Sequence, residues 1–195
     1  MSAQIGDLYS FLLTNMTLFR VAISLVVVAV IAAVFFSTGV QAGKKEDGEA
    51  FLAAKAQETG IYKLPSGMLI QVLKKGTGSK SPNANDDCDV HYAGTFPDGK
   101  KFDSSYDRGA PATFKPTQVI KGWTEALQLM REGDKWKVFI PYEIAYGASG
   151  RPPTIPAYSP LVFEMELIKV KGAGKPAADA DKQIQEKLGR PYSEL

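Results

Sequence analysis

Residues 119–130 have the sequence VIKGWTEALQLM, and the neighbouring segments are best understood as packing around them. Wound as a helix of 3.6 residues per turn, this stretch places its large apolar side chains on one side. These are Val119, Ile120, Trp123, Ala126, Leu127 and Met130. Thr117 is a suitable N-cap and Gly133 a suitable end. Because the flanking segments alternate like strands, we expect a sheet curled over this helix.

Gly122 is the unusual residue of this predicted helix. Glycine inside a helix costs about 1 kcal/mol relative to alanine, so a compensating reason is expected. We predict that another chain segment approaches the helix closely at this position, where a side chain would block it.

Composition places the chain among globular proteins. Its 195 residues suit one domain of roughly 100–150 residues with appendages. Apolar residues make up 45% and charged residues 23%, and a net charge of +2 is too small to indicate a nucleic-acid partner. Cys88 is the single cysteine, which excludes an intrachain disulfide and a cysteine metal cluster.

Residues 1–42 contain an apolar segment, 21–42, without charge or proline. As a helix it spans about 33 Å, enough to cross a bilayer, whereas a buried core helix would be shorter and periodic. Two interpretations remain open: a signal peptide cleaved near Ala42, after the small-x-small pattern Val40-x-Ala42, or an uncleaved anchor. Positive charges favour the cytosolic side, so Lys44-Lys45 would place the domain of an uncleaved anchor in the cytosol. This orientation conflicts with export of the domain, and cleavage removes the conflict. We expect a secretory-pathway protein, either anchored by a single helix or secreted.

Two segments flank the predicted folded domain. Residues 43–66 are expected to form a helical connector, with Phe51 and Leu52 on its apolar face, that spaces the domain from a membrane or joins two copies in a homodimer. Residues 172–195 are expected to form a flexible tail with a short helix over 181–188.

Residues 67–171 have the pattern of a β-rich domain. Apolar and polar residues alternate in short runs separated by Gly- and Pro-rich stretches, and Pro97-Asp98-Gly99 predicts a turn. The predicted strands cover 68–73, 86–94, 100–103, 112–115, 135–140 and 161–168. The predicted fold is therefore α+β: an antiparallel half-barrel sheet of five or six strands wrapped around one short central helix, preceded by the N-terminal hydrophobic helix and the connector.

Three motifs suggest other functions and fail on their details. Residues 94–101 resemble a phosphate-binding loop, but Lys101 replaces the hydroxyl that Mg²⁺ needs and the segment opens a strand, so a hairpin turn is expected. The acidic run 86–89 lacks the glycine-turned ligand loop of a hard-cation site. His91 is the only histidine and points away from Tyr92, so we expect a structural role for it.

Aromatic residues are concentrated on the segments that converge around the central helix. They are Tyr92, Phe102, Phe114, Trp123, Tyr146 and Phe163. Each of them alone is more typical of a core. Together with Asp103 they describe an apolar cup with few polar groups at its rim, which is typical of a binding site.

Five ordered motifs resemble the FKBP-type peptidyl-prolyl cis-trans isomerases. They are Val90-His91-Tyr92-x-Gly94, Lys101-Phe102-Asp103-Ser104-Ser105, Val119-Ile120-Lys121-Gly122-Trp123, Ala145-Tyr146-Gly147 and Leu161-Val162-Phe163-Glu164-Met165-Glu166-Leu167. The stretches Leu64-Pro65-Ser66-Gly67 and Pro111-Ala112-Thr113-Phe114 look like the macrophage infectivity potentiator branch, whose members are secreted or surface-bound.

The resemblance implies a site and its ligands. Its catalytic positions are Tyr92, Phe102, Asp103 and Tyr146, and its substrate-binding positions are Val119, Ile120, Trp123 and Phe163, with Ile155 and Tyr158 at the mouth. By resemblance, Trp123 is the floor under the proline ring, while the Ile120 N–H and the Tyr146 hydroxyl donate to the substrate backbone. The implied partners are proline-containing polypeptides and macrolide inhibitors of the rapamycin type, with no cofactor and no metal.

Two other functions remain open, and the first of them would use the same residues as the isomerase. A binding module would hold proline segments or macrolides in the cup without significant catalysis. A chaperone or surface adaptor would depend chiefly on the connector and the tail. A hydrolase is the weakest alternative, because no Ser-His-Asp or Cys-His set can be assembled. We favour the isomerase.

Overall fold

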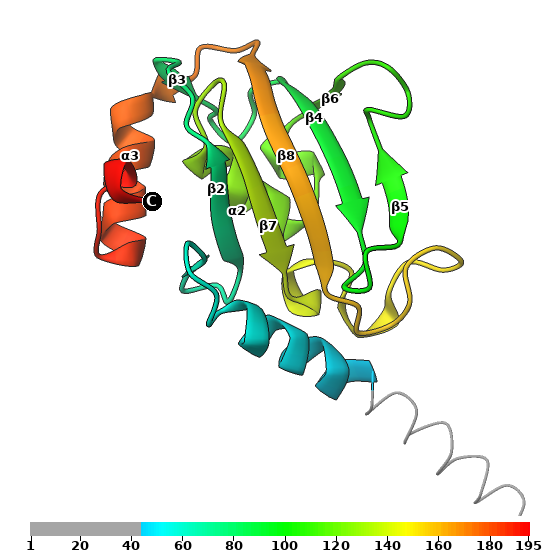
Figure 1. Cartoon of the computed structure of the whole chain (residues 1–195). Helices are drawn as coiled ribbons and strands as arrows, with labels where there is room; N and C mark the ends of the chain where they lie inside the picture. Colours follow the sequence, from blue (N-terminus) through cyan, green and yellow to red (C-terminus); the bar gives the residue numbers. More distant parts are fainter. Residues whose placement is uncertain (1–43) are drawn as a thin grey trace, which may run out of the picture. The chain divides into compact units, whose positions relative to one another are not determined.

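A computed structural model describes residues 44–195, which form one compact unit. The predicted signal peptide or anchor, with its apolar segment 21–42, lies outside the described residues. Between residues 44 and 195, no helix combines the length and the apolarity that crossing a bilayer requires. The unit begins with a helix over residues 44–55, the cyan helix of Figure 1, where the connector was predicted.

An antiparallel sheet of seven strands forms the centre of the unit (Figure 1). Its order is β1-β2-β7-β8-β4-β5, and β6 also pairs with β4. These strands are β1 (Tyr62–Lys63), β2 (Leu69–Lys74), β4 (Cys88–Thr95), β5 (Lys101–Ser104), β6 (Ala112–Phe114), β7 (Lys135–Ile140) and β8 (Leu161–Val170). A separate two-stranded sheet joins β3 (Lys80–Ser81) to β9 (Lys175–Pro176). The predicted α+β half-barrel is confirmed, and the two-residue edge strand β1 is an addition to it.

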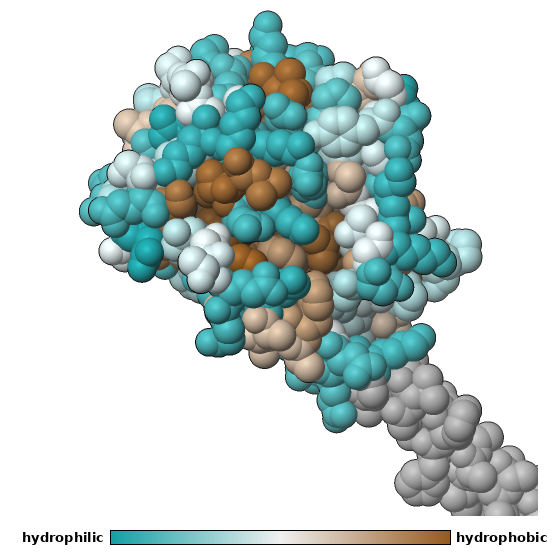
Figure 2. Space-filling view, in the orientation of Figure 1, coloured by the Kyte–Doolittle hydropathy of each residue, from teal (hydrophilic) through white to brown (hydrophobic). Residues whose placement is uncertain are grey.

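One face of the sheet is apolar. The other face is polar except for a second buried cluster, Leu69, Phe139 and Val162, against which Phe51 and Leu52 of the helix over 44–55 pack. Along β8, Met165 and Leu167 are fully buried, while Glu164 and Glu166 alternate with them and are only partly covered. On the polar face, Lys135 Nζ lies 2.5 Å from a carboxylate oxygen of Glu164. Hydrophilic side chains likewise cover most of the molecular face in Figure 2, between small groups of hydrophobic ones. Alternation in the sequence thus decides which face of each strand is buried.

Helix α2 (Lys121–Leu129) lies against the sheet and is seen behind β2 and β7 in Figure 1. It buries Trp123, Ala126 and Leu127. The surrounding core includes Met68, Ile70, Val90, Trp136, Val138, Ile140, Met165 and Leu167. Trp123, Ala126 and Leu127 of the predicted apolar face are therefore covered by the concave side of the half-barrel.

The central helix starts later than we predicted. A short 3-10 turn, η1 (Pro116–Gln118), comes first, and Val119 and Ile120 are extended. Thr117 lies within η1 and does not cap α2, whose N-cap residue is Ile120. The error arises because two adjacent apolar residues fit the spacing of a helix face and of an extended segment equally well.

Gly122 brings α2 close to β7. A Cβ atom at this position would lie 2.5 Å from Ile140 Cγ2 and 2.9 Å from Ile140 Cδ1, both too short for real contacts. The predicted close approach at Gly122 is confirmed, and the approaching segment is β7.

The C-terminal segment differs from the flexible tail that we expected. Helix α3 (Ala177–Leu188) packs beside α2 and buries Ala180 and Ile184. The sequence conceals this packing because its apolar face is narrow and lies among charged residues. Such a face stabilises a helix only when it is docked against a partner surface.

A buried carboxylate holds the end of this segment. Asp134 is fully buried and accepts hydrogen bonds from the Tyr192 hydroxyl at 2.5 Å, from Gly76 N at 2.6 Å and from Arg131 N at 2.8 Å. Burial raises the pKa of Asp134, and these donors offset only part of that effect. Arg131 also forms an ion pair with Asp181 of α3. The segment is therefore part of the folded unit.

Replacing Gly122 with alanine tests the contact between α2 and β7. In an isolated helix the change stabilises by about 1 kcal/mol. Here the new methyl group collides with Ile140, and overpacking costs about 1–3 kcal/mol. We expect the collision to dominate and urea denaturation to give a lower free energy of unfolding. The loss should shrink in an Ile140→Ala background, and a stabilised Gly122→Ala protein would contradict the contact.

Replacing Tyr192 with phenylalanine tests the attachment of the C-terminal segment. The variant loses a hydrogen bond to a buried carboxylate, and bonds to charged groups contribute roughly 1.5–3 kcal/mol. We expect a loss of stability in that range by urea denaturation. Tyr106→Phe is the matched control, because the Tyr106 hydroxyl is 3.5 Å from Glu166 on an exposed surface. Equal effects of the two substitutions would refute the proposed role of Tyr192.

Candidate active site

One open cavity of about 420 Å³ collects most of the predicted site residues. It is lined by Tyr92, Phe102, Asp103, Phe114, Gln118, Val119, Ile120, Trp123, Tyr146, Arg151 and Phe163. Eight of the ten residues predicted from the sequence are in this lining, and Ile155 and Tyr158 are not. The lining comes from four strands, from η1 and the extended residues that follow it, from the first turn of α2 and from the loop between β7 and β8.

The Trp123 indole is held by three aromatic rings and retains 4% of its surface exposed. The rings of Tyr92, Phe114 and Phe163 lie 5.0, 5.4 and 5.2 Å from it, at interplanar angles of 83°, 81° and 87°. Edge-to-face aromatic pairs contribute about 0.5–1.5 kcal/mol each beyond the burial of their area. The three contacts hold the indole in one orientation, as a largely buried part of the cavity wall.

Three polar side chains form a closed triangle at the rim. The Tyr92 hydroxyl donates to Asp103 Oδ2 at 2.6 Å. Arg108 donates through Nη1 to Asp103 Oδ1 at 2.6 Å and through Nη2 to the Tyr92 hydroxyl at 2.7 Å. Each of the three groups is hydrogen-bonded to the other two, so the rim has a defined geometry despite its partial exposure to water.

These contacts settle the ionisation states at the rim. Burial works against ionisation of Asp103, but the hydrogen bonds from Tyr92 and Arg108 outweigh it and hold the pKa of the carboxyl below its ordinary value. Burial, followed by the hydrogen bond to Asp103, raises the pKa of Tyr92. At neutral pH Tyr92 is therefore a neutral donor, and the charge of Asp103 is balanced by Arg108.

Backbone constraints on β4 position the aromatic wall. The fully buried Ser105 accepts a hydrogen bond from Tyr92 N at 2.7 Å and donates from its own backbone N–H to Tyr92 O at 2.9 Å. Gly94 makes room for two rings: a Cβ there would lie 2.7 Å from Phe102 Cζ and 2.7 Å from Phe163 Cε1. The rings can approach the strand this closely only because the residue between them has no side chain.

Two hydrogen-bond donors come from segments outside the aromatic wall: one belongs to Ile120, just before α2, and one to Tyr146, in the loop between β7 and β8. The Ile120 carbonyl accepts the first bond of α2, from Thr124 N at 3.0 Å, but the Ile120 N–H has no backbone acceptor within residues 44–195. The Tyr146 hydroxyl donates to no group of that part of the chain either. Both donors belong to residues that line the cavity, where a bound molecule could accept their hydrogen bonds.

Comparisons with known proteins identify this arrangement. Residues 78–168 match the family described as FKBP-type peptidyl-prolyl cis-trans isomerase. The macrophage infectivity potentiator of Trypanosoma cruzi is 53% identical over 132 residues, which are 68% of this chain and 67% of that protein. The chain belongs to the FKBP-type peptidyl-prolyl cis-trans isomerase family. Within the family, it falls in the macrophage infectivity potentiator branch.

Other relatives and solved structures of the FKBP type agree. FkpA of Aeromonas hydrophila is 52% identical over 137 residues, 70% of this chain but 49% of its own length, so the chain spans about half of that relative. A peptidyl-prolyl cis-trans isomerase from Pseudomonas syringae is 42% identical with a TM-score of 0.63, covering 67% of this chain and 95% of that structure. The structure of FkpA from Escherichia coli is 41% identical with a TM-score of 0.65, and the match covers 72% of this chain and 63% of that structure.

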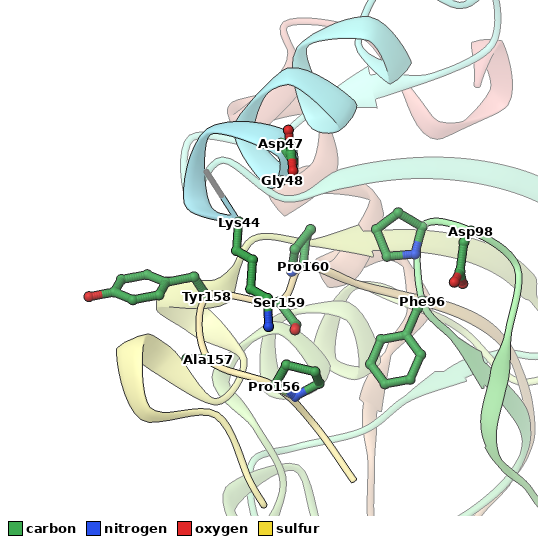
Figure 3. A pocket seen from close by; sticks show the side chains of 11 residues that line it. Lys44, Asp47, Gly48, Phe96, Asp98, Pro156, Ala157, Tyr158, Ser159 and Pro160 are labelled. Carbon is green, nitrogen blue, oxygen red and sulfur yellow. The ribbon is translucent and has the colours of Figure 1, made fainter. Parts of the chain in front are cut away.

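Two predicted residues of this FKBP-type domain do not line the cavity. Ile155 is 4% exposed and packs into the core. Tyr158 packs edge-on against Tyr142 at 5.2 Å and lines a second cavity, of about 350 Å³, with Lys44 and Phe96. In Figure 3 the Tyr158 ring points away from Phe96. The course of a long loop decides these directions, and residue spacing carries no information about it.

Three lining or rim residues, Arg108, Gln118 and Arg151, were not assigned to the site from the sequence, and Phe114 was predicted only as part of the aromatic cup. The sequence pointed to Phe114 because it is one of the aromatic residues on the segments that converge around the central helix. The other three are polar residues in turns and loops, where most such side chains are simply solvated. Only the folded chain brings Arg108 against Asp103.

His91 lies on the other face of β4. Its ring stacks on Tyr106 at 4.5 Å with an interplanar angle of 8°, and its Nδ1 is 2.9 Å from Ser105 Oγ. These contacts join β4 to the turn after β5. Across residues 44–195, no three His, Cys, Asp or Glu side chains are placed to hold a metal ion.

Replacing Gly94 with alanine tests the packing of the FKBP-type aromatic wall. The added methyl group would overlap the rings of Phe102 and Phe163, and overpacking costs about 1–3 kcal/mol. We expect urea denaturation to report a loss in that range, together with a change in near-UV circular dichroism. Part of the loss should disappear in a Gly94→Ala, Phe102→Leu double variant. A neutral single substitution would show that the rings are not confined by the strand.

Proposed function

We propose that this chain accelerates cis–trans rotation about X–Pro bonds in proline-containing polypeptides. The observation that carries the proposal is the convergence of eight motif residues on one open cavity that includes a largely buried indole. A volume of about 420 Å³ accommodates a proline ring with its neighbouring backbone. The relatives from Aeromonas hydrophila and Pseudomonas syringae are themselves named peptidyl-prolyl cis-trans isomerases.

The reaction needs an environment rather than a reactive group. Resonance keeps the X–Pro amide planar, with a rotational barrier of roughly 18–20 kcal/mol. The planar amide is more dipolar than the twisted one, so an apolar cavity disfavours the ground state relative to the transition state. Only interactions that favour the twisted state accelerate rotation. A nucleophile, a base and a covalent intermediate are all unnecessary.

Each proposed residue has a role in this environment. The proline ring packs on the Trp123 indole between the aromatic side chains. The Ile120 N–H and the Tyr146 hydroxyl donate to substrate carbonyls at fixed positions, which orients the bond that rotates. Asp103 stays ionised and, through Tyr92, keeps the aromatic wall in place. Macrolides of the rapamycin type, which carry carbonyls for the same donors, are the proposed inhibitors.

A binding module without significant catalysis is the second candidate function. The same residues serve both, because the cavity that holds a twisted X–Pro segment also holds a planar one. Turnover alone separates the two candidates.

The rest of the chain suggests where the reaction takes place. We assign residues 1–42 to a signal peptide or membrane anchor, 43–66 to a connector that can join two copies, and 67–171 to the isomerase domain. A further relative, from Legionella longbeachae and 46% identical over 129 residues, is named an outer membrane protein, which supports targeting to the secretory pathway. The substrates would then be polypeptides at a membrane surface or outside it.

Two tryptophan substitutions test the proposed function. In full-length protein solubilised in a non-ionic detergent, Trp123→Phe should lower kcat/KM for an X–Pro peptide about tenfold, equal to about 1.4 kcal/mol of transition-state stabilisation. Trp136→Phe is the matched control, since Trp136 is fully buried outside the cavity and its indole N–H, like that of Trp123, has no partner within residues 44–195. Catalysis no faster than buffer by the folded wild-type protein would defeat the isomerase proposal and leave the binding module.

A further inference from the structure

The cavity of the proposed isomerase has one uncompensated charge. Two charged residues line it, Asp103 and Arg151. Asp103 is neutralised by Arg108, whose Nη1 lies 2.6 Å from its Oδ1. The Arg151 guanidinium forms neither an ion pair nor a hydrogen bond with any group of residues 44–195. The mouth of an otherwise apolar site therefore presents a net positive charge.

The backbone of Arg151 is held in place. Its N–H donates to Ile155 O at 2.8 Å, and its carbonyl accepts from Ile155 N at 2.9 Å. The Ile155 side chain is 4% exposed and packs into the hydrophobic core. The loop segment that carries Arg151 is thus closed by two hydrogen bonds and anchored by a core residue, so the Arg151 side chain projects from a defined point.

The Arg151 side chain lies beside Tyr146, a proposed substrate-binding residue. Its guanidinium carbon lies 5.8 Å from the centroid of the Tyr146 ring, within the range of a cation–π interaction. The Tyr146 hydroxyl is one of the two donors assigned above to the substrate backbone. A substrate chain that reaches Tyr146 therefore passes beside a guanidinium cation.

We infer that Arg151 makes this site select X–Pro segments that carry a carboxylate within two residues of the proline. The inference rests on the proposed function, because it names the substrate class of the same cavity. A guanidinium pairs with a carboxylate through two parallel hydrogen bonds, and the neutralised Asp103 adds little repulsion. The contact is exposed to solvent, so its effect on kcat/KM is roughly two- to fivefold and is weakened by salt.

Peptides that differ in one residue measure the selectivity. Each contains a single X–Pro bond and has Glu, Gln or Lys at one position, from two residues before the proline to two residues after it. The full-length protein in a non-ionic detergent supplies the catalyst, and NMR exchange spectroscopy measures cis–trans exchange without a coupling protease. At low ionic strength, we expect Glu to exceed Gln roughly two- to fivefold at one or more positions, with Lys below both. The preference should fade in about 0.5 M salt.

Variants assign the preference to Arg151. Arg151→Gln should bring the Glu-to-Gln ratio to about one, and Arg151→Glu should reverse the order of Glu and Lys. Arg190→Gln is the matched control: it removes the same charge from an exposed residue whose guanidinium lies over Tyr62, outside the cavity, and should keep the wild-type ratio.

Two results overturn the inference separately from the proposed function. If all peptides exchange faster than in buffer but the wild-type protein treats Glu and Gln alike at every position, Arg151 does not select and the isomerase proposal stands. The same conclusion follows if Arg151→Gln retains the preference. If no peptide exchanges faster than in buffer, the proposed function fails and this inference fails with it.

Discussion

The contact between Gly122 and Ile140 constrains the whole arrangement. Because no side chain separates α2 from β7 at this point, the helix lies against the sheet closely enough for the next residue, Trp123, to be packed by rings from the surrounding strands. A longer residue at position 122 would lift the helix and move the indole with it. The helix accepts the conformational cost of an internal glycine, about 1 kcal/mol, because close packing of the core offsets it.

A second missing side chain shapes the wall of the cavity. Gly94 allows Phe102 and Phe163 to approach β4, and these two rings meet each other at 5.5 Å with an interplanar angle of 90°. The candidate site is therefore continuous with the hydrophobic core and uses the same aromatic contacts. It differs from the rest of the core in being open on one side. An apolar host for a peptide bond can be built in this way without any reactive side chain.

Polar groups are placed where they do not disturb this apolar surface. Asp103 is paired at the rim, and Asp134 is satisfied by several donors where it holds the C-terminal segment. The hydrogen bonds of Asp103 satisfy the one carboxylate in the cavity lining, and Asp134 lies outside that lining. Arg151 is the exception, because it is held at the mouth without an ion pair or a hydrogen bond from its guanidinium to the described part of the chain. The conformation of the loop that carries Arg151 therefore affects which substrates the site would prefer.

Periodicity and motif order in the sequence were sufficient to determine the α+β half-barrel, the apolar face of the central helix and the family, because each depends on residues that are regular or near one another in the chain. Only the tertiary structure decided that Val119 and Ile120 are extended, that Tyr158 lies outside the cavity and that Arg108 closes the rim. It also decided that the C-terminal segment is docked rather than flexible. The physical reason is that side chains in loops and turns, and narrow apolar helix faces, take their conformation from the surfaces they meet. Those surfaces are built by strand pairing and helix packing, which residue spacing alone does not encode.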